Sequence, residues 1–105
     1  MLTTKQWLLW YDVSSDYLAR RGEFREAHLQ LARQATAQGI LKAGGALTEP
    51  AADSPCAAAL YFQTDNRADI EAFVAADPYV QHGLVTQYRI LRWNTVAGCV
   101  AEQQL

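Results

Sequence analysis

The segment from Asp77 to Leu84, Asp-Pro-Tyr-Val-Gln-His-Gly-Leu, limits the possible folds of this chain more than any other. A residue before proline is pushed out of the helical region, so a helix that precedes Asp77 has to end there. Asp77 can cap a short new turn, Pro78 can begin it, and Gly83 can end it. The apolar run at 84–93 is typical of a strand. The segment therefore predicts an abrupt change from helix to strand.

The rest of the chain alternates between strand and helix patterns. Ser14 to Asp16 offers a cap for a separate short turn, Gly39 is a helix stop, and Asp65-Asn66 can cap the second helix. The tail from residue 94 is expected to add a short strand around Val96. The elements expected are strands at residues 5–12, 40–47, 57–64 and 84–93 and helices at residues 24–38 and 67–76. This order predicts a ferredoxin-like α+β fold, with both helices on one face of a four-stranded antiparallel sheet.

Size and charge limit the classes of partner. A length of 105 residues predicts one domain. The formal net charge of −2 and the scattered arginines argue against nucleic acid as a partner. No apolar run approaches the ~20 residues that a membrane span needs. Residues 1–5 and the apolar run after them have no cleavage-site pattern, so we expect no signal peptide. Cys56 and Cys99 lie outside any CxxC pair, so we expect free thiols, packed or partly packed, in a reducing compartment, by default the cytoplasm.

The first strand predicts an oligomer. Trp7, Leu9 and Tyr11 would share one face, and Leu8 and Trp10 the other. A sheet covered by helices on one side only should turn a polar second face to water, and this face is apolar. A second copy could cover it with its own sheet. The sequence therefore predicts a homodimer built sheet to sheet.

The predicted topology also brings distant residues to one edge of the sheet. That edge carries Tyr11-Asp12, the helix positions Arg25 and His28, the flexible pair Gly44-Gly45, and the turn at 77–83. His28 lies on the apolar stripe of the first helix, near its expected start. A few polar groups in an apolar surround are typical of a small-molecule site.

A histidine beside an aspartate has a clear chemical use. The carboxylate of Asp77 can accept a hydrogen bond from one imidazole nitrogen of His28 and fix the tautomer, so that the other nitrogen can move a proton. No activated nucleophile completes a triad. Zinc held by His28, Asp77 and His82 is a weaker option, because the spacing matches no known pattern. We expect no metal and no other cofactor.

Each of these residues also has a structural interpretation. His28 could be a core histidine with a satisfied hydrogen bond, and Asp77 could be only an N-cap. Tyr79 could pack on the helix ends or contact a ligand. Arg25 could hold an anion or be simply exposed.

Several segments of the sequence resemble the YCII-related (YciI-like) family. They are Arg25-Glu26-Ala27-His28-Leu29, Gly39-Ile40-Leu41 with Ala43-Gly44-Gly45, and Ala76-Asp77-Pro78-Tyr79-Val80 with Gly83-Leu84. The resemblance covers a core of about residues 5–97 of a single domain 1–105, with a C-terminal tail at 98–105. It implies a dimeric α+β barrel in which His28 and Asp77 match the family's proposed active-site pair. One branch of the family looks like a dehydrochlorinase of chlorinated hydroxyquinols, and the fold is similar to that of muconolactone isomerase.

The chain departs from the family pattern at two positions. Glu26 stands where proline often precedes the histidine dipeptide, and Gly45 stands where proline often follows Ala-Gly.

The sequence leaves two functions of different class open. The first is a lyase or isomerase that uses His28 and Asp77 for proton transfer on a small anionic or phenolic metabolite, with Arg25, Gly44, Gly45 and Tyr79 as ligand contacts. The second is a dimeric ligand-binding or accessory protein without turnover.

Overall fold

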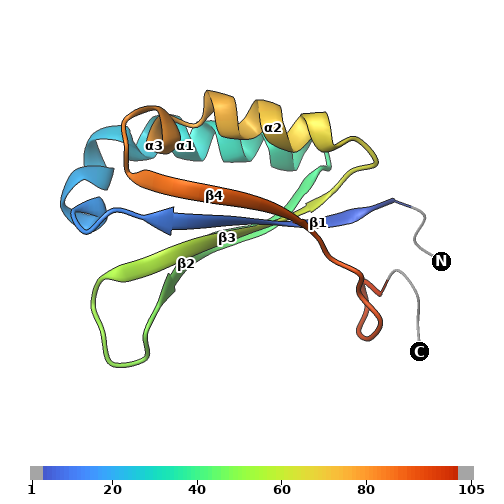
Figure 1. The fold of residues 1–105 in the computed structure, drawn as a ribbon. Helices are drawn as coiled ribbons and strands as arrows, with labels where there is room; N and C mark the ends of the chain where they lie inside the picture. The colour runs from blue at the N-terminus through green and yellow to red at the C-terminus, as the bar shows by residue number, and fades with distance from the viewer. Residues whose placement is uncertain (1–3, 102–105) are drawn as a thin grey trace.

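Four antiparallel strands form one sheet, and the helices cover one of its faces in a computed structural model that describes residues 4–101 (Figure 1). The strand order in the sheet is β2-β3-β1-β4. The elements are β1 (Gln6–Val13), α1 (Tyr17–Ala37), β2 (Leu41–Thr48), β3 (Pro55–Gln63), α2 (Arg67–Ala76), α3 (Pro78–Gln81) and β4 (Val85–Arg92). The predicted ferredoxin-like α+β fold is therefore confirmed.

The first helix is longer than the sequence predicted. It begins at Tyr17 and not at Phe24, so His28 lies in the middle of the helix and not near its start. The mixed sequence before Phe24 and the interior Gly22, which costs about 1 kcal/mol relative to alanine, argued against a helix there. Tertiary contacts outweigh that cost, because the Tyr17 ring packs edge-on against Tyr79 with centroids 5.5 Å apart.

The other boundaries differ less from the prediction. Gly39 follows α1 with a φ of 81°, which favours glycine, and the Asn66 side chain accepts from the Ala68 N–H at the start of α2. β3 begins at Pro55, two residues earlier than expected, because it pairs there with β2. The strand expected around Val96 is absent from the described chain. The expectations for residues 1–3 and 102–105 lie outside the described residues.

The core lies between the helix layer and the inner face of the sheet. Its largest fully buried side chains come from β1, β3 and α2 and from the residue before β4: Leu9, Tyr11, Phe62, Ile70 and Leu84. Leu9 pairs with Leu60 on β3 and with Ile90 on β4, so the inner face is apolar across neighbouring strands.

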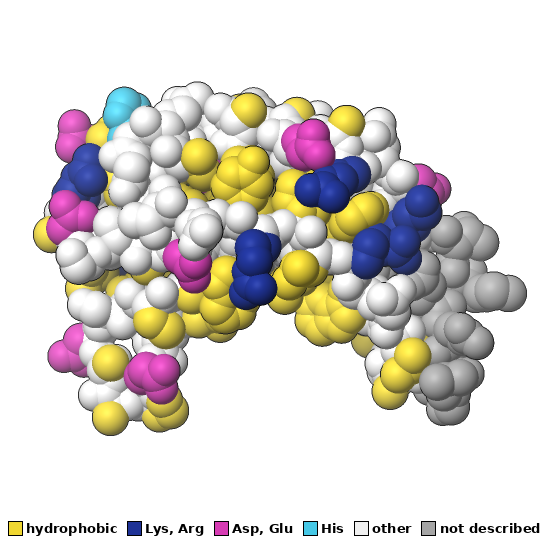
Figure 2. All heavy atoms as spheres, in the orientation of Figure 1, with side chains coloured by type: hydrophobic (Ala, Val, Ile, Leu, Met, Phe, Trp, Pro, Cys, Tyr) yellow, Lys and Arg dark blue, Asp and Glu magenta, His cyan; other side chains and the backbone are white. Residues whose placement is uncertain are grey.

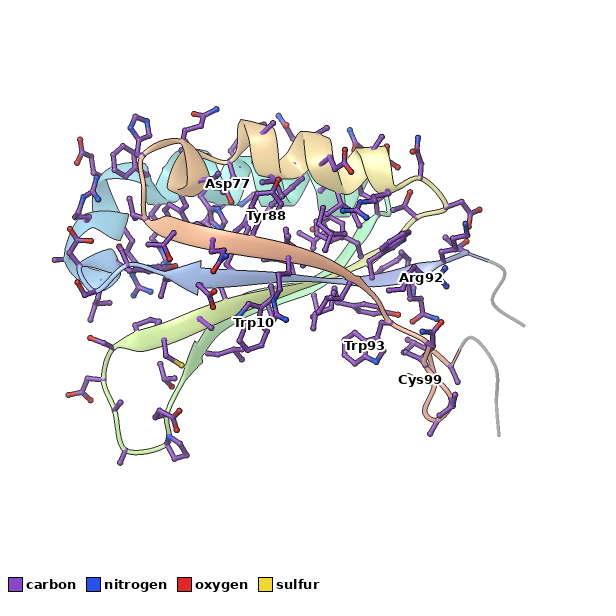
Figure 3. All side chains as sticks on the ribbon, viewed as in Figure 1. Trp10, Asp77, Tyr88, Arg92, Trp93 and Cys99 are labelled. Atoms are coloured by element: carbon purple, nitrogen blue, oxygen red, sulfur yellow. The ribbon has the colours of Figure 1, made fainter. Side chains whose placement is uncertain are left out.

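The outer face of the sheet, away from the helices, is also apolar. Figure 3 shows the Trp10 and Trp93 side chains on this side of the sheet. Leu47, Leu91 and Trp93 are 39%, 40% and 45% exposed, which is high for such large apolar side chains. Apolar side chains gather in the hollow beneath the sheet in Figure 2. We call this surface the open face, and it agrees with the apolar second face expected from the sequence.

The two cysteines are free, and both are exposed, which corrects the expectation of packed thiols. Cys56 lies at the start of β3, and Cys99 lies in the segment after β4. Within residues 4–101, no helix has the length and apolar character that crossing a membrane requires.

Candidate active site

His28 and Asp77 meet in the structure although they lie 49 residues apart in sequence. His28 extends from the middle of α1, and Asp77 stands at the junction of α2 and α3. The His28 Nδ1 atom lies 2.9 Å from the Asp77 Oδ1 atom. The Asp77 side chain is 0% exposed and the His28 side chain is 17% exposed, so the carboxylate lies behind the imidazole. The meeting of the two side chains that the topology predicted is therefore observed.

Among residues 4–101, the Asp77 side chain has three hydrogen-bond partners. Besides His28, the Tyr11 hydroxyl donates to its Oδ2 atom at 2.9 Å, and the Tyr79 N–H donates to its Oδ1 atom at 3.0 Å. The last bond is the N-cap of α3, so the capping interpretation of Asp77 and the pairing interpretation both hold. An ionised carboxylate can only accept, and we therefore assign the proton to Nδ1 of His28. In that tautomer the Nε2 atom, on the other side of the ring, carries the lone pair that can accept a proton.

Tyr11 is the third member of this network. Burial raises the pKa of its hydroxyl well above the ordinary value, and the negative charge of Asp77 and the hydrogen bond to it raise the pKa further. Tyr11 thus remains a neutral donor that fixes the orientation of the carboxylate. The sequence placed Tyr11 at this edge of the sheet but gave no sign of its bond to Asp77.

A cavity of about 360 Å³ opens between α1 and β2 in front of His28. Five residues predicted to form the site line it: Arg25, His28, Gly44, Gly45 and Tyr79. Asp77 does not line it, but its buried carboxylate contacts the imidazole of His28, which does. The imidazole and the Tyr79 ring stack with centroids 4.0 Å apart and planes 13° apart. Gly44 and Gly45 are not a flexible pair, because both are paired with β3 inside the β2 strand.

Among the other residues that line the cavity, three that carry an aromatic ring or a positive charge were missed by sequence reasoning: Tyr17, Arg21 and Lys42. Tyr17 and Arg21 were missed because the helix was expected to begin after them. A signal was present, since Tyr17, Arg21, Arg25 and His28 follow one another at helical spacings of four, four and three. Lys42 lies at a register shift between Leu41 and Ala43, and such bulges redirect side chains next to functional sites.

Some candidate residues lie elsewhere. His82 stacks on Phe24 with ring centroids 4.3 Å apart, away from the His28–Asp77 contact. Glu26, one of the two departures from the family pattern, pairs with Arg33 on the exposed side of α1 at 3.0 Å. Among residues 4–101, no three His, Cys, Asp or Glu side chains come together as metal ligands would.

These features define a class of protein, a ferredoxin-like α+β domain with a cavity between its helix layer and an outer strand. The sequence profile of the YCII-related domain matches residues 6–94. The chain therefore belongs to the YCII-related domain family. No curated protein matches this sequence.

A solved structure with the same fold is 5-chloro-2-hydroxyhydroquinone dehydrochlorinase from Burkholderia phenoliruptrix AC1100, in complex with 2,5-dihydroxybenzoquinone. The TM-score is 0.73 over 86% of this chain and 94% of that chain, and the sequence identity is 19%. At this identity the likeness shows the fold alone.

Proposed function

We propose that the protein is a small-molecule enzyme of the lyase or isomerase type, in which His28 moves a proton and Asp77 orients it. The observation that carries the proposal is the 2.9 Å contact between a fully buried carboxylate and an imidazole that lines a cavity. A positioned general acid or base contributes about 10²- to 10⁴-fold to a rate. The Tyr11 hydroxyl and the Tyr79 N–H hold the carboxylate from two further directions, so the pair is rigid before a ligand arrives.

The proposed substrate is a small anionic or phenolic molecule. The cavity has room for one small ring, and Arg25, Gly44, Gly45 and Tyr79 form part of its wall. The structural neighbour is a dehydrochlorinase of a hydroxyhydroquinone. Loss of hydrogen chloride from a ring requires removal of a proton, which is the step that a His–Asp pair can perform. The fold likeness supports this chemistry as the first to be tried on this chain.

The proposal includes a homodimer that forms through the open face. The exposure of Leu47, Leu91 and Trp93 supports it, because large apolar side chains exposed on one face of a sheet favour burial against a partner. The proposed location is the cytoplasm, where the two free cysteines would stay reduced.

The test compares the two histidines of the chain. Purified wild type, His28→Gln and His82→Gln are incubated with 5-chloro-2-hydroxyhydroquinone, and chloride release is measured. We expect His28→Gln to lose activity by about 10²-fold or more, since the proton-transfer group is gone. His82→Gln should keep full activity, because His82 packs on Phe24 outside the cavity.

Equal activity of the three proteins would contradict the role of His28. A thermal-shift panel of small phenols and organic acids covers the alternative, a binding protein without turnover. A compound that stabilises the wild type and is recovered unchanged after long incubation would favour that alternative.

A further inference from the structure

The Tyr79 hydroxyl is buried without a hydrogen-bond partner among residues 4–101. Tyr79 as a whole is only 3% exposed. Its ring is held on one face by His28, with which it stacks, and it meets the Tyr17 ring at an interplanar angle of 74°. The Tyr79 N–H is bound to Asp77, so the backbone is held as well. The ring is thus held in place, and a partner for the hydroxyl has to come to it.

A buried hydroxyl without a partner is rare in folded proteins and requires an explanation. Tyr79 is one of the residues that line the cavity in front of His28, so a ligand in that cavity is the acceptor that we consider for its hydroxyl. Burial raises the pKa of Tyr79, and Tyr17 adds to the shift, while Arg25 and Arg21 oppose it. A hydroxyl with a raised pKa keeps its proton at neutral pH and is therefore available as a donor.

The charges around the cavity indicate which acceptor it would be. Arg21, Arg25 and Lys42 line the cavity, and no Asp or Glu is among the described residues that do. Neither Arg21 nor Arg25 forms an ion pair within residues 4–101, whereas the neighbouring Arg20 pairs with Asp16. The whole chain has a net charge of −2, so the positive lining of this cavity differs from the charge of the chain as a whole.

We propose that the cavity binds its ligand through an acidic oxygen, a phenolate or a carboxylate, that accepts a hydrogen bond from the Tyr79 hydroxyl and is flanked by Arg21 and Arg25. This inference rests on the proposed function, because both assign the substrate to the same cavity. The stack of Tyr79 on His28 then sets the geometry, because a small ring held at the hydroxyl lies within reach of the imidazole. Tyr79 and the arginines bind the ligand, and His28 remains the group that moves the proton.

The binding test uses benzoate, its neutral counterpart benzamide, and 4-nitrophenol, whose ionisation is visible in its absorption spectrum. We expect the wild type to bind benzoate or 4-nitrophenolate more tightly than benzamide, by calorimetry at low salt. Tyr79→Phe removes only the hydroxyl and keeps both ring contacts. It should weaken binding of the acids by about ten- to a hundredfold, the range expected for a hydrogen bond to a charged partner.

Two controls distinguish a ligand contact from a structural role. Tyr88→Phe changes a tyrosine on β4 that is 45% exposed, and it should bind the probes like the wild type. Without ligand, Tyr79→Phe should unfold at the same temperature as the wild type or higher, because the hydroxyl that it loses is unsatisfied. Arg21→Gln with Arg25→Gln should raise the pKa of bound 4-nitrophenol relative to its value in the wild type.

The inference is wrong if the wild type binds none of the acids, if it binds benzamide as tightly as benzoate, or if Tyr79→Phe retains full affinity. A preference for benzoate but not for 4-nitrophenolate would identify the acid as a carboxylate, and the reverse would identify it as a phenolate. Failure of the proposed function would give a different result. Chloride release would then not depend on His28, whatever the affinity of the protein for benzoate.

Discussion

Replacement of Asp77 tests the buried network directly. Asp77→Ala removes the acceptor of three hydrogen bonds, from Tyr11, His28 and the Tyr79 N–H. Asp77→Asn is nearly isosteric and keeps the Oδ1 atom, which accepts from both His28 and the Tyr79 N–H. Its amide group would replace Oδ2 and could donate to the Tyr11 oxygen. The two variants therefore both lose the charge, but only Asp77→Ala loses the whole network.

The expected costs differ accordingly. Loss of the cap of α3 costs about 1 kcal/mol. The Tyr11 hydroxyl left buried without a partner adds about 1–3 kcal/mol. Asp77→Ala should therefore lower the free energy of unfolding by about 2–4 kcal/mol, or the Tm by roughly 10–25 °C for a domain of this size. Asp77→Asn should cost about 1 kcal/mol, since one hydrogen bond is rearranged.

The assay is urea unfolding followed by tryptophan fluorescence, with the slope m used to check that both variants unfold from the same compact state. Activity is measured on the same samples and should fall in both variants, because neither retains the carboxylate beside His28. A cost below ~0.5 kcal/mol for Asp77→Ala, the range of ordinary surface substitutions, would refute the network as a source of stability. Equal costs for the two variants would show that the charge, and not the hydrogen bonds, contributes the stability.

Three further outcomes are expected. Burial raises the pKa of Tyr11 in the folded state, so above pH 10.0, its ordinary value, the unfolded chain loses this proton first. The free energy of unfolding should then fall as pH rises, by up to ~1.4 kcal/mol per pH unit more in the wild type than in Tyr11→Phe. Equal pH dependence of the two proteins in alkaline urea unfolding would contradict this. Gly44→Ala should weaken benzoate binding, because its new Cβ would lie 3.3 Å from a β3 side chain at the cavity wall. The Cβ in Gly45→Ala would meet nothing within 4 Å, so this variant is the control. Equal benzoate affinities of the two variants by calorimetry would refute this expectation. Leu91→Glu on the open face should give a monomer by sedimentation, whereas Leu18→Glu on α1 should remain a dimer. A wild type that is monomeric at micromolar concentration would contradict the proposed dimer.

Much of the fold could be predicted because its signals are local. The stop at Gly39, the cap at Asn66 and the turn that begins at Asp77 each depend on a few neighbouring residues, and the structure has all three. The alternation of apolar side chains in β1 was equally readable, since it needs only the period of a strand. The element order then restricted the topology enough to bring His28 and Asp77 to the same edge of the sheet.

The start of α1 depends on more than local signals. Most residues between Tyr17 and Phe24 are good helix formers, but Gly22 interrupts them, and the packing of Tyr17 on Tyr79 is a contact that the sequence does not show. The position of Lys42 depends on a register shift in β2, and nothing in the sequence around it signals that shift. Both residues belong to the cavity wall, so the full extent of the cavity became visible only in the structure.

The sequence by itself thus determined the order of the elements, their caps and the edge at which the polar residues gather. The tertiary structure decided how those residues are bonded: Tyr11 reaches Asp77 across 66 residues of sequence, and the Tyr79 hydroxyl is left without a partner among residues 4–101. The physical reason is the distance along the sequence over which each interaction acts. Caps and periodicity act between residues a few positions apart, whereas the partner of a buried side chain depends on how whole elements pack against one another.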